Sequence, residues 1–146
     1  MKKLILILST LVFSQLALAQ NTIVISSFNH KESVNKILST IKAKGLTHFS
    51  TIHHHLGAKK VNSFLRPTTL IIFGNPKVGT QLMKENQLMG IELPLKVLVF
   101  ETETGDVKVA YHNPSGFSSE YSLNKKKSLL VKIDKAMNSI ISVIQK

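Results

Sequence analysis

The feature that most constrains the fold is an apolar stripe near the end of the chain. Apolar residues recur there with the period of a helix: Leu129, Leu130, Ile133, Met137, Ile140, Ile141 and Ile144. Residues at this spacing lie on one side of an α-helix. A helix of this kind has to bury its apolar side, and a chain of 146 residues has room for one domain. The stripe therefore predicts a long C-terminal helix that covers an apolar surface of the same domain.

Short apolar segments predict the surface that this helix covers. β-Branched and aromatic residues indicate strands over 21–26, 47–55, 68–73, 93–102 and 107–112. The segment 68–73 is apolar on both faces, which is typical of a strand buried in the middle of a sheet. Gly105 and Asp106 indicate a hairpin between the last two strands. A short helical turn is expected over 58–64.

Capping residues predict two further helices. Asn29 is followed three residues later by Glu32, an arrangement that begins a helix, and Gly45 ends it. Asn75 and Pro76 begin a second helix that ends near Gly90. The order β-α-β-β-α-β-β-α predicts an α+β domain, with a mostly antiparallel sheet and helices packed on one face.

The N-terminus has the pattern of a secretory signal. Lys2 and Lys3 precede an apolar stretch from Leu4 to Leu16, and Ala17-Leu18-Ala19 supplies the small residues that signal peptidase requires. The stretch is shorter than the ~20 apolar residues that span a bilayer, although an uncleaved anchor is the alternative. We expect residues 1–19 to be removed, which leaves a single domain over 20–146 in the periplasm or secreted. Contact with the membrane is not expected after cleavage.

Composition excludes several classes of function. The chain has no Cys, which rules out disulfides, thiolate metal sites and a Cys nucleophile. Loss of Lys2 and Lys3 with the signal lowers the formal charge from +11 to +9, still strongly basic. A single Arg, few aromatic residues and export nevertheless argue against a nucleic-acid partner. The lysines of the last helix, Lys132 among them, are expected to be solvated.

Two long motifs resemble a known family. Residues 65–80 read LRPTTLIIFGNPKVGT and residues 90–101 read GIELPLKVLVFE, while 43–46 and 52–58 match shorter patterns upstream. Over residues 22–124 the chain resembles domain-of-unknown-function family 302 (DUF 302). The resemblance implies a compact α+β domain similar to the TATA-box-binding-protein-like architecture, often dimeric, and it implies no particular activity. Two positions depart from the family pattern, because His53 replaces an Asp and Glu120-Tyr121 replaces an Arg-His pair.

Three consecutive histidines suggest a metal site. Imidazole binds Zn, Cu and Ni, and alternate residues of a strand share a face, so His53 and His55 point one way while His54 points the other. His30, His48 or His112 would have to complete the ligand set in space. Ordinary polar or interface histidines are the alternative interpretation of the same residues.

Polar residues inside the family motifs suggest a ligand site. His54, Arg66, Tyr111 and His112 lie beside strands that are otherwise filled with Val, Ile and Leu. We expect a homodimer with a shallow pocket in which these four side chains bind a small anionic or redox-active molecule. Alternatively, Arg66 forms a structural ion pair with Glu92 or Glu101.

No arrangement of residues indicates catalysis. The eight carboxylates are scattered, and 74–80 lacks the Gly-Lys-Ser/Thr ending of a phosphate-binding loop. The segment 113–119 is expected to be a flexible loop that exposes Phe117. The sequence therefore favours a small-ligand-binding or interaction protein rather than an enzyme. The rival is a metal-binding or metal-dependent hydrolytic protein that uses His53, His55 and His112.

Overall fold

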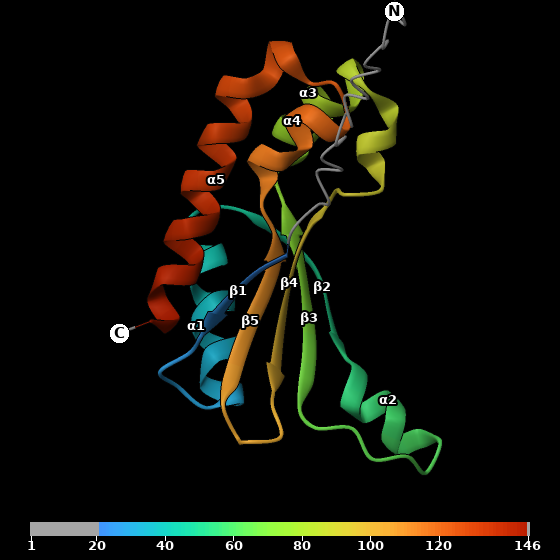
Figure 1. The fold of residues 1–146 in the computed structure, drawn as a ribbon, viewed down its shortest axis with the longest axis vertical. Coiled ribbons are helices and arrows are strands. Elements are labelled where there is room, and N and C mark those ends of the chain that lie inside the picture. Colours follow the sequence, from blue (N-terminus) through green and yellow to red (C-terminus); the bar gives the residue numbers. More distant parts are fainter. Residues whose placement is uncertain (1–20, 146) are drawn as a thin grey trace, which may run out of the picture.

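A computed structural model describes residues 21–145, which form one five-stranded antiparallel sheet with the strand order β1-β5-β4-β3-β2 (Figure 1). The predicted signal, residues 1–19, lies outside the described residues. The strands are β1 (Asn21–Ile25), β2 (Thr47–His53), β3 (Thr68–Gly74), β4 (Leu95–Glu101) and β5 (Val107–His112). The predicted antiparallel α+β class is confirmed.

Register places the first strand of the chain beside the last one. β1 pairs with β5 through Val24 and Val109, and the next pair inward joins Val109 to Val99 of β4. β4 and β5 form the expected hairpin, where Gly105 has a φ of +84°, a conformation that side-chain-bearing residues rarely adopt. The first strand therefore lies at one edge of the sheet and β2 at the other.

Helices cover one face of the sheet. The helices are α1 (His30–Ala43), α2 (His54–Lys60), α3 (Pro76–Glu85), α4 (Phe117–Glu120) and α5 (Lys127–Ile141). α1 and α5 lie against the same face in Figure 1. The Asn29 side chain accepts a hydrogen bond from the Glu32 amide at 3.0 Å, which confirms the predicted cap. The inner residues of the sheet and of both helices form one core, including Ile37, Ile71, Val97, Val109 and Ile140.

The opposite face of the sheet is open among the described residues. Ile71 and Phe73 of β3 are buried, but Leu70 and Ile72 on the other face are only half-buried. The prediction that 68–73 is buried on both faces is therefore wrong, although β3 is an interior strand. Its apolar outer residues instead belong to a broad apolar face that includes Ile23 and Ile52.

Several element boundaries differ from the predictions. β2 ends at His53, and the next helix runs over His54–Lys60 rather than 58–64, so the triple histidine spans a strand-to-helix junction. α3 ends at Glu85 and a separate 3-10 turn covers Gln87–Gly90. Residues 114–120 form a 3-10 turn and α4 instead of a flexible loop, and Phe117 is buried. Within residues 21–145, no helix is long and apolar enough to cross a membrane.

Candidate functional site

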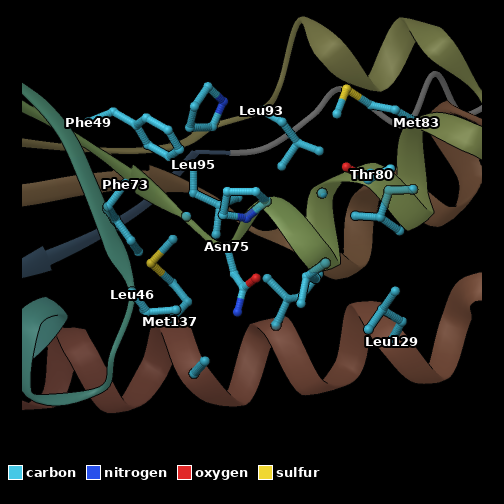
Figure 2. Close-up of a pocket in the computed structure, with 18 of the residues that line it drawn as sticks. Leu46, Phe49, Phe73, Asn75, Thr80, Met83, Leu93, Leu95, Leu129 and Met137 are labelled. Atoms are coloured by element: carbon cyan, nitrogen blue, oxygen red, sulfur yellow. The ribbon is translucent and has the colours of Figure 1, made fainter.

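An apolar cavity of about 480 Å³ lies between α3, α5 and one end of the sheet (Figure 2). β3 ends at Gly74, and α3 begins immediately after it, because the Asn75 side chain accepts a hydrogen bond from the Lys77 amide at 3.0 Å. This short connection holds α3 beside the end of the sheet rather than on the face that α1 and α5 cover. The space left between α3 and α5 is the cavity.

Apolar side chains from five parts of the chain line this cavity. α5 contributes its apolar stripe, and α3 contributes residues from its own inward side. The remaining lining comes from the start of β2, from the end of β3 and from the approach to β4. The apolar lining residues labelled in Figure 2 are Leu46, Phe49, Phe73, Met83, Leu93, Leu95, Leu129 and Met137. Such a pocket suits an apolar molecule, since ligand sites typically have ~300–1,000 Å³ and mostly apolar walls.

Few polar groups reach the cavity. Asn75 and Thr80 come from the start of α3, and Lys132 comes from α5. Figure 2 shows the Asn75 side chain directed from the start of α3 toward α5. Sequence reasoning missed this site because the cavity forms only when two helices separated by more than forty residues meet. The available signal was Lys132, which interrupts the apolar positions of α5 at helical spacing.

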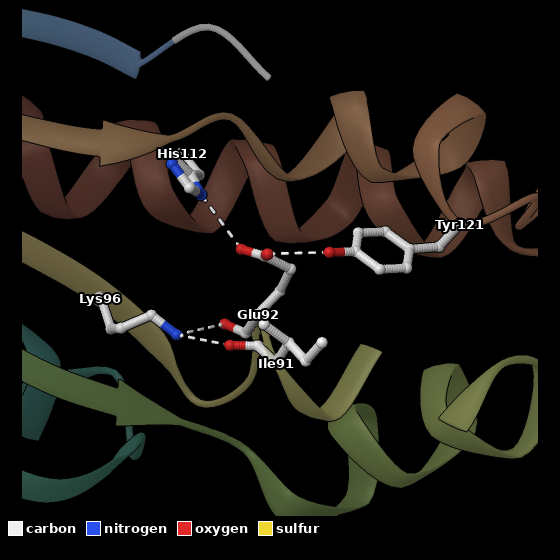
Figure 3. Close-up of polar contacts among 5 residues, drawn as sticks. All are labelled: Ile91, Glu92, Lys96, His112 and Tyr121. Carbon is white, nitrogen blue, oxygen red and sulfur yellow. Dashed lines mark hydrogen bonds and ion pairs between the residues drawn. The ribbon is translucent and has the colours of Figure 1, made fainter. Parts of the chain in front are cut away.

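A polar site, separate from the apolar cavity, surrounds Glu92 near the start of β4 (Figure 3). One carboxylate oxygen of Glu92 lies 3.0 Å from His112 Nδ1, and the other accepts a hydrogen bond from the Tyr121 hydroxyl at 2.9 Å. Lys96 Nζ donates to the backbone carbonyls of Ile91 and Glu92 at 3.0 and 3.1 Å. These contacts join β5, the segment before β4 and the end of α4.

The network changes the acidity of two of its members. Burial by itself would raise the pKa of Glu92, but the hydrogen bonds with His112 and Tyr121 outweigh it, and the pKa is lowered. The hydrogen bond to Glu92, followed by burial, raises the pKa of Tyr121 to about 12. Tyr121 stands at one of the positions where the chain departs from the family pattern, and here it serves as a hydrogen-bond donor.

The four residues predicted to share a ligand pocket lie in different places. His54 is exposed at the start of α2, and Arg66 pairs with Glu103 at 3.1 Å rather than with Glu92 or Glu101. Tyr111 is on the inner face of β5, where its hydroxyl donates to Asn138 Oδ1 at 3.4 Å, whereas His112 is on the outer face. Only Tyr111 and His112 are neighbours: both line a cavity of about 200 Å³ beside Glu92, although they are on opposite faces of the strand.

His53 and His55 lie close together, and His30 joins them. The ring centres are 5.6 Å apart for His53–His55 and 5.7 Å apart for His30–His55. His53 Nδ1 lies 3.0 Å from the Thr69 hydroxyl, and His55 Nδ1 contacts the Thr68 backbone. Within 21–145, no group of three His, Cys, Asp or Glu side chains is arranged to hold a metal ion. The predicted completion by His112 does not occur, because that ring contacts Glu92.

The histidine cluster also has an electrostatic consequence. Burial, followed by the neighbouring His55, lowers the pKa of His30 below its usual value. His30 Nε2 is buried without a hydrogen-bond partner among the described residues. His48 lies apart from this group and contacts the Thr51 hydroxyl at 2.8 Å. The lowered pKa therefore favours the neutral form of His30.

Comparison with known proteins finds a matching family and similar solved structures. The model of the family described as "Domain of unknown function DUF302" matches residues 22–140. A crystal structure of an uncharacterized conserved DUF302 protein from Bacillus stearothermophilus superimposes with a TM-score of 0.75 at 18% sequence identity. The similarity covers 85% of this chain and 97% of that chain. At this identity the likeness concerns the fold alone.

Curated relatives share a segment of their length with this chain. A protein of Brucella suis called fluoride-specific ion channel FluC 1 is 33% identical over 101 residues, which is 69% of this chain and 40% of the relative. The proteins called FluC 1 in Brucella abortus and FluC 2 in Brucella melitensis give the same identity over 37% of their length. The chain thus spans about two fifths of the curated relatives it matches.

Proposed function

The chain belongs to the DUF302 family, and we propose that this member binds a small apolar molecule in the cavity between α3 and α5. The cavity itself is the observation that carries the proposal, because about 480 Å³ of apolar-walled space is open to a ligand. Burial of apolar ligand surface would supply the affinity, at roughly 25 cal/mol per Å² before the costs of association. We do not propose ion conduction for this chain, since more than half of the length of the curated relatives lies outside the match.

The position of the cavity beside the packed core supports ligand binding. Protein interiors are close-packed, and the main core beside the cavity buries Phe73, Met137 and Ile140 almost completely. These same three residues also line the cavity. A ligand there would therefore continue the packing of the core and would stabilise the folded chain by mass action.

Filling the cavity with a side chain is expected to prevent binding. Ala136 faces the cavity from α5, so Ala136→Phe places an aromatic ring in the space that a ligand would occupy. The probe is N-phenyl-1-naphthylamine, a neutral fluorophore whose emission rises in apolar surroundings. We expect saturable binding to the wild-type protein and an affinity lower by at least about tenfold, or 1.4 kcal/mol, for the variant.

The matched control adds the same ring outside the cavity. Ser139 is exposed on α5 and does not line the cavity, so Ser139→Phe is expected to bind the probe as the wild type does. Circular dichroism and thermal unfolding establish that both variants fold. Equal binding by Ala136→Phe and the wild type, or no saturable binding by the wild type, would contradict the proposed function.

Export and self-association form part of the same proposal. The signal pattern in residues 1–19 supports export to the periplasm, and the exposed apolar residues Ile23, Ile25 and Ile52 on the open sheet face support a homodimer. A native mass spectrum of protein recovered from the periplasm is expected to show a dimer of chains that begin at Gln20. Absence of the chain from the periplasm would refute export, chains that still begin at Met1 would refute cleavage, and a monomer at micromolar concentration would refute the dimer.

A further inference from the structure

Lys132 occupies an unusual position on α5. The residues of α5 that line the cavity recur with the helical period, at 129, 132, 133, 136, 137 and 140, and all of them except Lys132 are apolar. Lys132 is therefore exposed and also borders the cavity. Lys127 and Lys135 do not line the cavity, so contact with water is sufficient reason for their charge. Lys132 differs because it stands among the apolar residues that line the cavity.

The charge of Lys132 has no counter-ion in the described structure. The only ion pairs between residues 21 and 145 are Arg66–Glu103 and His112–Glu92, so Lys132 takes part in neither. No Asp or Glu is among the described residues that line the cavity. Lys132 lines the cavity and is exposed while its neighbours in the row are not, so it lies at the mouth, where an ammonium group keeps its contact with water.

An apolar cavity with one cation at its mouth matches a molecule with a tail and an anionic head. We infer that the ligand is a single-chain amphiphile whose tail fills the cavity and whose anionic head pairs with the Lys132 ammonium group. This inference rests on the proposed function, and it adds the chemical class of the ligand. An ion pair at the edge of an apolar wall is screened less than a pair in bulk water, so the head group contributes to affinity as well as to orientation.

The experiment compares two probes that share a tail and differ in charge. Dodecanoate and dodecanol are each used to displace N-phenyl-1-naphthylamine from the full mature chain at a pH above neutrality, where the acid is ionised. For the wild type we expect dodecanoate to compete about tenfold more strongly than dodecanol, as charge-assisted hydrogen bonds allow. Lys132→Met keeps an unbranched side chain of similar length and removes its charge, and it is expected to abolish the difference between the two probes.

A matched substitution on the same helix separates local pairing from general charge. Lys135 is exposed and does not line the cavity, so Lys135→Met lowers the net charge equally and is expected to retain the preference for dodecanoate. Lys132→Arg restores a cation at the mouth and is expected to restore the preference.

The remaining outcomes show whether this inference fails alone or together with the proposed function. If dodecanoate and dodecanol compete equally with the wild type, or if neither displaces a bound fluorophore, the inference is overturned while binding of apolar molecules stands. If Lys135→Met weakens dodecanoate as much as Lys132→Met does, the preference arises from net charge and the inference is again overturned. If the fluorophore does not bind to the wild type at all, both the inference and the proposed function fail.

Discussion

Glu92→Gln is expected to destabilise the protein by about 1.5–3 kcal/mol, because it replaces charge-assisted hydrogen bonds at a carboxylate that is only 12% exposed. The same change replaces the negatively charged acceptor of the Tyr121 hydroxyl with a neutral amide oxygen, which favours the protonated hydroxyl less. The pKa of Tyr121 is therefore expected to fall from about 12 toward its ordinary value of 10.0. Urea unfolding measures the first effect, and alkaline titration of tyrosinate absorbance measures the second.

Composition makes this titration simple to interpret. The chain has two tyrosines and no Trp, so Tyr111→Phe leaves Tyr121 as the single source of the signal. The comparison is then Tyr111→Phe with and without Glu92→Gln. A Tyr121 pKa that does not move between these two proteins would show that the hydrogen bond in Figure 3 does not control its acidity.

The lowered pKa of Glu92 also predicts the direction of a pH dependence. Its pKa in the folded protein lies below the ordinary value of 4.5, so between these two values the unfolded chain binds more protons than the folded one. The stability that Glu92 contributes is therefore complete above pH 4.5 and is lost as the pH falls through the pKa of the folded state. Glu92→Gln is expected to flatten this part of the curve of unfolding free energy against pH.

Ile71→Ala is expected to produce a comparable or larger loss, about 2–5 kcal/mol, by leaving a cavity in the main core. Ile71 is fully buried in β3, where it pairs in register with Val97 of β4 and Thr51 of β2. For a domain of ordinary stability, about 5–15 kcal/mol, this is a large share of the total. The urea midpoint is expected to fall accordingly.

The control for this prediction removes the same atoms from the open face of the sheet. Ile25 is 63% exposed, so Ile25→Ala is expected to change stability by about 0.5 kcal/mol or less. Equal losses at the two positions would contradict the assignment of one buried and one open face. The two isoleucines thus test the layer arrangement directly.

Local signals predicted the elements that depend on near neighbours. The cap at Asn29 and the stop at Gly45 placed α1, because a cap forms between residues three positions apart. The hairpin between β4 and β5 followed from Gly105 for a similar reason. The junction at His53 was harder, since the three histidines read equally well as the end of a strand or the start of a helix.

The sequence could not place in space the sites that depend on distant residues. His54, Arg66, Tyr111 and His112 belong to the family motifs, but a motif does not state which face of a strand a side chain occupies. The register of β5 sets Tyr111 inward and His112 outward, and a shift by one residue would exchange them. The partner of Arg66 is Glu103, which follows β4 after the hydrogen-bonded strand has ended.

The family, the α+β class and the order of the five strands and the three long helices follow from the sequence alone, because capping, periodicity and motifs are local. The tertiary structure decided which sheet face the helices cover, where α3 and α5 leave a cavity, and which groups meet at Glu92. These features arise from contacts between residues far apart in the chain. Local propensity does not encode such contacts, since they depend on how whole elements pack.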